Sequence, residues 1–232
     1  MRNMRNKFSI LFVLGLAIGS ARAAGGMTEV TYMDQEADAG GYVTRYLVTD
    51  RFLRMDYGRD REDFVLLDRR EKRAYNVNHE RREVLIFETG PLAIEKPKTW
   101  DTDDDVLSDR DAQKRLNLIV NGKVCTRILA SERFLPEVAQ ALAEFGEVMA
   151  ATHATSYLAT PPEQREPCDL ARLVLEPRRW FKYGLTLDEV HYSGFSRRLL
   201  NYQAGVAVRP RAFEVPENYR QINLKAQQGV LP

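Results

Sequence analysis

The chain has 232 residues, of which 44% are hydrophobic and 29% charged, and its 34 Lys and Arg nearly balance its 33 Asp and Glu. This composition is that of a globular protein, and the lack of a basic excess argues against a nucleic-acid-binding surface. A chain of this length forms one large domain or two small ones, and we expect a single domain over residues 24–232, because no Pro-, Gly- or Ser-rich linker divides them.

Residues 1–23 have the layout of a secretory signal peptide. Arg2, Arg5 and Lys7 precede the apolar run FSILFVLGLAIG, and the small residues of an A-x-A cleavage motif end the segment at Ala23. The apolar run is shorter than the roughly 20 residues that a membrane-spanning helix needs. We therefore expect cleavage after Ala23 and export to the periplasm, with an uncleaved membrane anchor as the alternative. Removal of the segment leaves 30 Lys and Arg against 33 Asp and Glu, a net charge of −3.

The first part of the mature chain predicts a series of short β-strands. Six segments rich in Val, Leu, Ile, Phe or Tyr are separated by short charged or Gly-containing breaks. They are 28–36, 42–49, 51–57, 63–68, 72–77 and 82–88. Breaks this short leave no room for the crossovers that parallel strands need, so we expect an antiparallel meander. A further hairpin is predicted over 117–129, around the Asn121-Gly122 turn.

Residues 96–115 interrupt the strand pattern and are predicted to form a solvated loop. The segment contains three aspartates at the first spacings of an EF-hand calcium loop, which are Asp101, Asp103 and Asp105. However, Val106 stands where that loop needs Gly, and Ala112 stands where it needs Glu. We therefore expect no calcium site here.

Residues 135–158 carry the longest helical signal. Val138, Leu142, Phe145 and Met149 recur at three- and four-residue steps, which predicts an amphipathic helix with one face to bury. We expect this helix to supply the main cover for the sheet.

A shorter helical stretch is predicted over 168–184, interrupted by Pro177, and strands return at 185–193 and 195–208. The order of strands, helices and strands predicts an α+β fold that is mainly β. The expected architecture is a curved antiparallel sheet, or half-barrel, with the long helix and the shorter helix packed on its concave face.

Cys125 and Cys168 are the two cysteines of the chain. In an oxidising compartment such a pair is expected to form a disulfide, which would stabilise the fold by roughly 3–4 kcal/mol. The alternative is a redox or metal-binding thiol pair, which the lack of a C-x-x-C motif disfavours.

The sequence contains no recognisable catalytic or metal-binding motif. His79, His153 and His191 are not at metal-ligand spacings, and neither a G-x-S-x-G elbow nor a Gly-rich phosphate loop occurs. We therefore predict structural histidines, no catalytic residue, no metal and no cofactor. A hydrolase assembled from distant carboxylates is the enzymatic alternative.

Two predicted strands, FVLL at 64–67 and VLIF at 84–87, are apolar on both faces. A strand with one face in water would alternate apolar and polar residues. Either helices and loops cover both faces, or a hydrophobic groove between sheet and helix receives an acyl chain or another apolar ligand. The residues expected to line such a groove are Met55, Phe87, Phe134, Leu142, Phe145 and Met149.

Three stretches, DRFLRMD, FVLLDRREKRAYNVN and FSRRLLNYQ…FEVPENY, carry a resemblance over about 28–88 and 185–220. With them the chain resembles the periplasmic lipoprotein-carrier superfamily, which includes the outer-membrane lipoprotein localisation factors and the lipid-sensing half-barrel of certain periplasmic anti-sigma regulators. The likeness is greater to an uncharacterised branch of that superfamily. It implies a helix-capped half-barrel whose apolar cavity holds lipid-like groups or a protein segment.

One feature of the carriers has no match in the sequence. They use a buried arginine to keep a lid closed, and none of the arginines considered for that role corresponds to it. The arginines considered are Arg45, Arg51, Arg54 and Arg127.

Two functions follow as expectations. The first is an exported, non-catalytic binding or carrier module with an apolar cavity for a lipid-like or acyl group. The alternative is a protein-interaction or sensor module that assists or regulates a cell-envelope complex. No segment after the apolar run at the N-terminus is apolar enough to span a membrane, so we do not expect an integral membrane protein.

Overall fold

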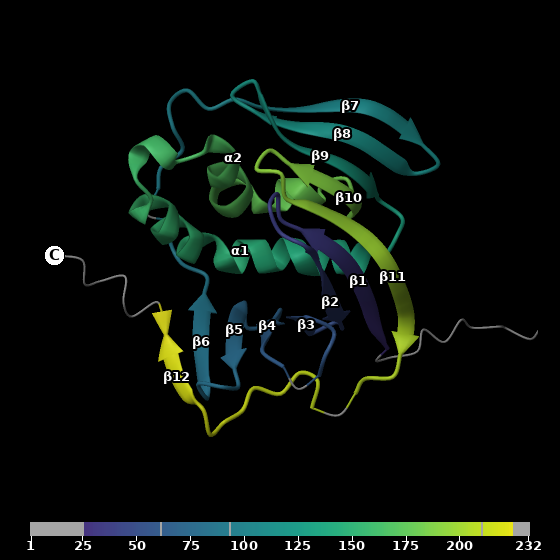
Figure 1. The fold of residues 1–232 in the computed structure, drawn as a ribbon, viewed down its shortest axis with the longest axis vertical. Coiled ribbons are helices and arrows are strands. Elements are labelled where there is room, and N and C mark those ends of the chain that lie inside the picture. The colour runs from purple at the N-terminus through teal and green to yellow at the C-terminus, as the bar shows by residue number, and fades with distance from the viewer. Residues whose placement is uncertain (1–25, 61, 93, 210, 225–232) are drawn as a thin grey trace, which may run out of the picture.

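The computed structural model describes residues 26–60, 62–92, 94–209 and 211–224. Within these residues a single twelve-stranded sheet curves around a layer of helices (Figure 1). The fold is α+β and mainly β, as the sequence predicts. The predicted signal peptide lies outside the described residues.

The first six strands form the expected antiparallel meander. They are β1 (Met27–Gln35), β2 (Gly41–Val48), β3 (Phe52–Asp56), β4 (Phe64–Asp68), β5 (Arg73–Asn78) and β6 (Glu83–Glu88). Each strand pairs antiparallel with the next along the chain. The charged breaks between them are tight turns, in which Lys72 and Arg82 adopt positive φ angles of 50° and 53°. Most charges of the breaks therefore lie at the turns, whereas the charged residues within the strands, such as Arg45, Arg54 and Asp56, are buried and paired.

The next three strands are β7 (Thr102–Arg110), β8 (Gln113–Val120) and β9 (Lys123–Ser131). The hairpin at Asn121-Gly122 is confirmed, with φ angles of 49° and 77° that suit a two-residue turn. The prediction of a solvated loop over 96–115 is wrong from Thr102 onward, because β7 pairs with β8 along its length. As an edge strand, β7 exposes Asp103, Asp105 and Asp109 while its backbone still forms the ladder. Asp104 points the other way and pairs with Arg179 and Lys182.

The C-terminal strands are β10 (Leu185–His191), β11 (Ser196–Val206) and β12 (Arg220–Asn223). The sheet order is β12-β6-β5-β4-β3-β2-β1-β11-β10-β9-β8-β7. The β1–β11 pair therefore joins the N-terminal meander to the strands β7–β11. The expected all-antiparallel sheet needs one correction, because β12 runs parallel to β6. A long return segment separates β11 from β12, which makes that orientation possible.

The long helix α1 (Pro136–Ala159) matches its prediction closely. The predicted shorter helical stretch is confirmed: α2 (Pro167–Asp169) continues directly into the π-helical η2 (Leu170–Leu175), and the 3₁₀-helical η3 (Pro177–Phe181) follows. A single 3₁₀ turn, η1 (Pro162–Gln164), precedes it. Pro177 starts η3, in line with its predicted break. No helix among the described residues is long and apolar enough to cross a membrane.

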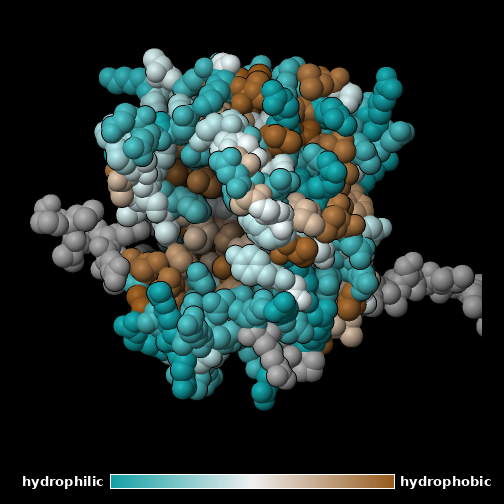
Figure 2. All heavy atoms as spheres, in the orientation of Figure 1, coloured by the Kyte–Doolittle hydropathy of each residue, from teal (hydrophilic) through white to brown (hydrophobic). Residues whose placement is uncertain are grey.

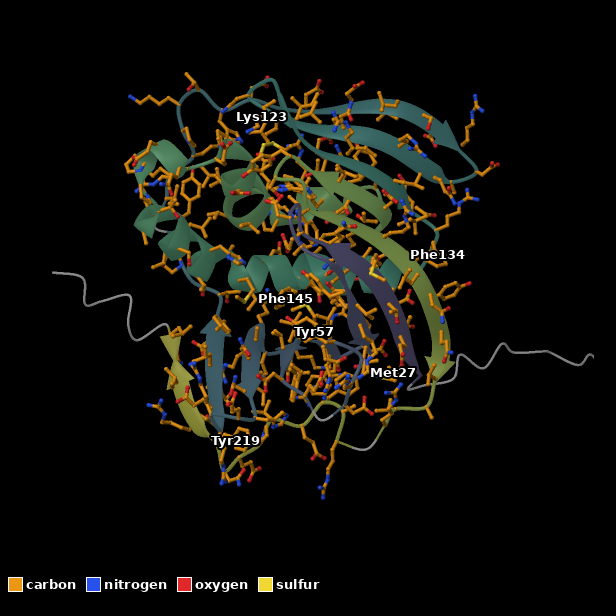
Figure 3. The ribbon with its side chains drawn as sticks, in the orientation of Figure 1. Met27, Tyr57, Lys123, Phe134, Phe145 and Tyr219 are labelled. Atoms are coloured by element: carbon orange, nitrogen blue, oxygen red, sulfur yellow. A yellow bond between two sulfur atoms is a disulfide. The ribbon has the colours of Figure 1, made fainter. Side chains whose placement is uncertain are left out.

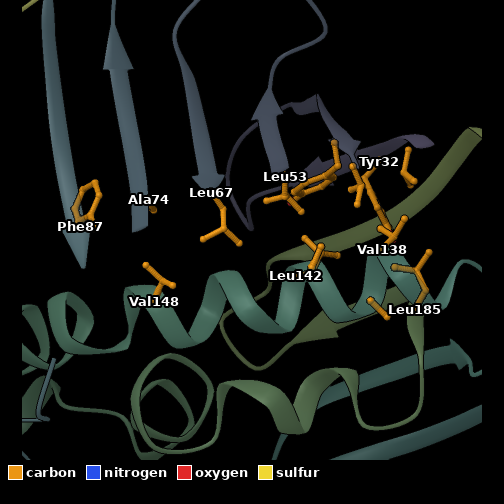
Figure 4. Close-up of a cluster of buried hydrophobic side chains, with 14 residues drawn as sticks. Tyr32, Leu53, Leu67, Ala74, Phe87, Val138, Leu142, Val148 and Leu185 are labelled. Carbon is orange, nitrogen blue, oxygen red and sulfur yellow. The ribbon is translucent and has the colours of Figure 1, made fainter. Parts of the chain in front are cut away.

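The main core lies between α1 and the concave face of the sheet (Figure 4). Val138 and Leu142 of the predicted stripe are buried there, and they face Leu53 and Leu67 of the meander. The opposite side of α1 packs against η2 and η3 and is rich in alanine. A helix covered on two sides is apolar around most of its circumference, which is what this one shows.

The convex face of the meander is covered by the C-terminal strap, which we define as residues 211–219. Phe64 and Val84 are buried on this face against Phe213 and Val215 of the strap. Leu67 and Phe87, from the same two strands, are buried on the face toward α1. The strands that the sequence makes apolar on both faces are therefore covered twice.

The disulfide between Cys125 and Cys168 is confirmed, with Cα atoms 5.3 Å apart. It ties β9 to the start of the helical segment that contains α2, η2 and η3. Both cysteines are fully buried in a second core with Leu118 and Trp180. The bond thus anchors the short turns that cover the interior of the half-barrel.

Candidate binding site

A cavity of about 250 Å³ lies between the concave face of the sheet and the helices, and we call it the inner cavity. The sheet contributes Tyr32, Tyr46, Met55, Thr186, Glu189 and Arg197. The helical elements contribute Leu142, Phe145, Gly146, Met149, His153, Arg172, Leu173, Pro177, Trp180 and Phe181. Figure 2 shows the surface hollowed near the centre of its view, with apolar residues in the depth of the hollow.

Four of the six residues predicted to line a groove meet at the inner cavity: Met55, Leu142, Phe145 and Met149. Figure 3 shows Phe145 near the centre of the molecule, between α1 and the strands of the meander. The structure places the other two elsewhere. Phe87 is part of the main core near Val148, and Phe134 makes an edge contact with the ring of Tyr202, 4.7 Å between centroids.

Arg197 is the cationic residue that the sheet contributes to the inner cavity. Its Nε and Nη2 donate to Asp34 at 2.7 and 2.6 Å, and its guanidinium lies 5.3 and 5.5 Å from the ring centroids of Tyr32 and Tyr46. Burial opposes the charge of Arg197, but Tyr46 and Asp34 outweigh it and hold the arginine's pKa well above its usual range. Burial likewise raises the pKa of the Tyr46 hydroxyl. Arg197 is therefore charged, and its two hydrogen bonds to Asp34 fix it in place.

Sequence analysis did not single out Arg197. A usable signal is its position in FSRRLL, two residues before the inward-facing Leu199 on the same strand. Of the four arginines considered for a buried role, Arg45 and Arg54 are buried, but on the convex face, where Arg54 donates to the carbonyl of Ala212 in the strap at 2.9 Å. Neither lines the inner cavity.

A second ion pair closes the helical side of the cavity. Arg172, from the π-helical η2, donates to Glu189 of β10 at 2.9 Å. π-Helical turns are rare and often mark functional positions. Each arginine that borders the cavity is thus matched by a carboxylate. Thr186 belongs to the cavity wall, and its buried hydroxyl has no hydrogen-bond partner among the described residues.

A second hollow of about 390 Å³ opens beside the first, and we call it the outer hollow. It shares Met55 and Arg197 with the inner cavity, so these two side chains stand between the two spaces. Its other lining residues are Asp34, Tyr42, Thr44, Asp56, Tyr57, Asp63, Phe64, Val65, Asn76 and Asn78. These residues lie at or near the ends of β1, β3 and β5 and the starts of β2 and β4. Because neighbouring strands are antiparallel, these ends and starts all meet at the same edge of the meander.

The structure brings Ser193 and Asp169 near His191, an arrangement that the sequence does not reveal. His191 Nδ1 lies 2.9 Å from Ser193 Oγ, but its Nε2 is 4.0 Å from the nearest Asp169 oxygen. That distance is beyond a hydrogen bond, and Asp169 instead accepts from the Tyr192 hydroxyl at 2.8 Å. A serine-hydrolase triad needs both hydrogen bonds of the imidazole, so this cluster does not have that geometry.

The other two histidines, His79 and His153, have contacts or burial that are consistent with a structural role. His79 Nδ1 lies 2.8 Å from the hydroxyl of Tyr219, the last residue of the strap. Burial lowers the pKa of His153, which borders the inner cavity. Among the described residues no group of three or more His, Cys, Asp or Glu side chains is placed to hold a metal ion.

Comparison with known proteins gives little family information. No family model and no curated protein matches the chain. An uncharacterized conserved protein from Thermus thermophilus is similar at 8% identity and a TM-score of 0.41, covering 86% of this chain and 91% of its own. PNGF-II is similar in two crystal forms at 8% identity and TM-scores of 0.42 and 0.43, over 88% of this chain. This chain spans about one third of the length of PNGF-II, with 33% and 32% covered.

Proposed function

We propose that this chain is an exported, non-catalytic binding or carrier module that holds the apolar, acyl-like part of a ligand in the inner cavity. The observation that carries the proposal is the convergence of Met55 from the sheet with Leu142, Phe145 and Met149 from α1 on one cavity. A resemblance to the periplasmic lipoprotein carriers and a helix-covered half-barrel support the same proposal.

The chemistry of the cavity suits an uncharged, apolar group. Each methylene moved from water into such a space contributes about 0.8 kcal/mol. Thioether and aromatic side chains adapt to chains of different shape. The charges of Arg197 and Arg172 are each matched by a carboxylate, so no net charge favours an ionic group inside.

Export belongs to the same proposal. The disulfide between β9 and α2 suits an oxidising compartment, where such bonds form and persist. With the predicted signal peptide at residues 1–23 and cleavage after Ala23, the periplasm is the proposed location.

A second candidate function is a protein-interaction or sensor module for a cell-envelope complex. The observation that favours it is the exposure of large apolar side chains on β11, where Leu200 is 50% and Tyr202 47% exposed. Exposed apolar residues that gather on one element mark interaction surfaces. Crosslinking in the periplasm that recovers one stable partner, together with an empty inner cavity, would favour this candidate.

The first experiment is native mass spectrometry of the mature chain taken directly from the periplasm. We expect an added mass that organic extraction removes. A Met149→Trp variant fills the inner cavity and should lose the added mass, whereas Met33→Trp, the same change at a half-exposed site outside it, should retain it. A mass equal to the bare chain in every preparation would contradict the carrier function.

A further inference from the structure

The rim of the outer hollow combines two tyrosine rings with a carboxylate. Tyr42 and Tyr57 lie edge to face with centroids 6.1 Å apart, and both are exposed to solvent. Asp63 lines the same hollow from the start of β4. Aromatic faces carry partial negative charge, so rings beside a carboxylate form a local environment that favours a cation.

Asp63 differs from the other carboxylates of the hollow in its partners. Asp34 is neutralised by Arg197, and Asp56 by Arg45 and Arg54.

The oxygens of Asp63 accept hydrogen bonds from the His79 amide at 2.7 Å and the Asn78 side chain at 2.8 Å. No described Lys or Arg forms an ion pair with Asp63, so the residues that the structure describes leave its charge unmatched.

Glu36 adds to the negative charge of the rim. It accepts a hydrogen bond from the Tyr42 hydroxyl at 3.3 Å and has no ion-pair partner among the residues that the structure describes. Burial and nearby carboxylates raise the pKa of Tyr42. The rim is thus acidic and aromatic, in contrast to the apolar and internally neutral inner cavity.

The two spaces adjoin, because Met55 and Arg197 border both. Methionine is flexible and unbranched, and its side chain can shift to let a chain pass from one space to the other. Taken together, the spaces have the layout of a site for an amphiphile, with an apolar end inside and a polar end at the rim.

We propose that the outer hollow binds a cationic ammonium head group of an amphiphile whose apolar chain occupies the inner cavity. The inference rests on the proposed function and adds the chemical class of the head group. The Asp63 carboxylate supplies the counter-charge, and the Tyr42 and Tyr57 rings supply cation–π contacts. An anionic head group is disfavoured, because it would meet the charges of Asp63 and Glu36.

The test compares two detergents with the same chain by calorimetric titration of the mature protein at pH 8, below their micelle concentrations. Dodecyltrimethylammonium carries a positive head group, and dodecyldimethylamine N-oxide has a head of similar size with no net charge. We expect the ammonium to bind about tenfold more tightly. Asp63→Asn should abolish that preference, whereas Asp111→Asn, the same charge change in the exposed β7–β8 turn, should keep it.

A second variant, Tyr57→Leu, tests head-group binding even if Asp63→Asn fails to fold. Tyr57 is 63% exposed, so Tyr57→Leu should leave the fold intact and weaken ammonium binding about threefold, a larger loss than for the N-oxide. Equal binding of both detergents to the unaltered protein would overturn the head-group inference and leave the carrier function standing. Binding of neither detergent would overturn both.

Discussion

Arg197 of β11 and Asp34 of β1 form a two-pronged ion pair beside the inner cavity, although 163 positions separate them in the chain. Asp34 is only 1% exposed and accepts a further hydrogen bond from Thr44 at 2.8 Å. The pair therefore joins the two strands that connect the meander to the C-terminal half of the sheet. Its position makes it structural as well as part of the cavity wall.

Replacing Arg197 with Met should lower the free energy of unfolding by about 3 kcal/mol, because it leaves Asp34 buried without its counter-charge. Urea denaturation followed by circular dichroism measures the change. The neighbouring Arg198 offers a matched control, since its side chain is 75% exposed and paired with Asp188. Arg198→Met should cost less than about 1 kcal/mol. Equal losses in the two variants would contradict a buried role for the pair.

Reduction of the disulfide should lower the free energy of unfolding by about 3–4 kcal/mol, because the bond restricts the unfolded chain. Urea denaturation with and without a reductant measures this, and a Cys125→Ala, Cys168→Ala double variant should match the reduced protein. Thiol alkylation and intact mass provide the covalent check. Two alkylated thiols in unreduced protein taken from the periplasm would show that the bond does not form there.

Stability should fall as the pH drops from about 6.5 toward 4, in part through His191. Burial, reinforced by Arg172, lowers the pKa of His191 to about 4 in the folded protein. The unfolded chain, whose histidine pKa is about 6.5, therefore takes up a proton in this range before the folded protein does. This histidine's contribution is fully present above about pH 6.5 and should decline by about 2 kcal/mol as the pH falls toward 4.

The measurement is urea denaturation between pH 4 and pH 7 for the unaltered chain and for His191→Gln. Titration of the carboxylates changes the stability of both proteins alike. The difference between the two curves of unfolding free energy against pH therefore gives the contribution of His191. The variant should show a shallower dependence on pH. Parallel curves would mean that His191 titrates alike in the folded and unfolded states.

The C-terminal strap should be needed for the stability of the meander. Phe213 stacks on Phe52 with centroids 5.4 Å apart and packs against the convex core, so Phe213→Ala should cost about 2–3 kcal/mol. Its neighbour Glu214 is exposed, and Glu214→Ala should change the free energy of unfolding by less than about 0.5 kcal/mol. Hydrogen exchange should also show faster opening of β4 and β6 in the first variant. Unchanged hydrogen-exchange rates in β4 and β6 would mean that the strap covers the sheet but does not stabilise it.

Features that depend on local spacing could be predicted from the sequence. The Val138–Leu142–Phe145–Met149 stripe predicts α1 because helical periodicity is a property of neighbouring residues, and Asn121-Gly122 predicts its turn because of their backbone preferences. The pairing of Cys125 with Cys168 follows from their number alone in an oxidising compartment. The mainly-β class follows from the short, closely spaced strands of the meander.

Features that depend on distant partners were decided by the tertiary structure. β7 is a strand because β8 offers it a backbone partner, and the aspartates of β7 neither reveal nor prevent that pairing. The strap covers the convex face because β12 returns to β6, a pairing between segments far apart in the chain. The inner cavity and the Arg197–Asp34 pair arise only when β11 pairs with β1. Local sequence determines which elements form, whereas burial and strand order determine which side chains meet.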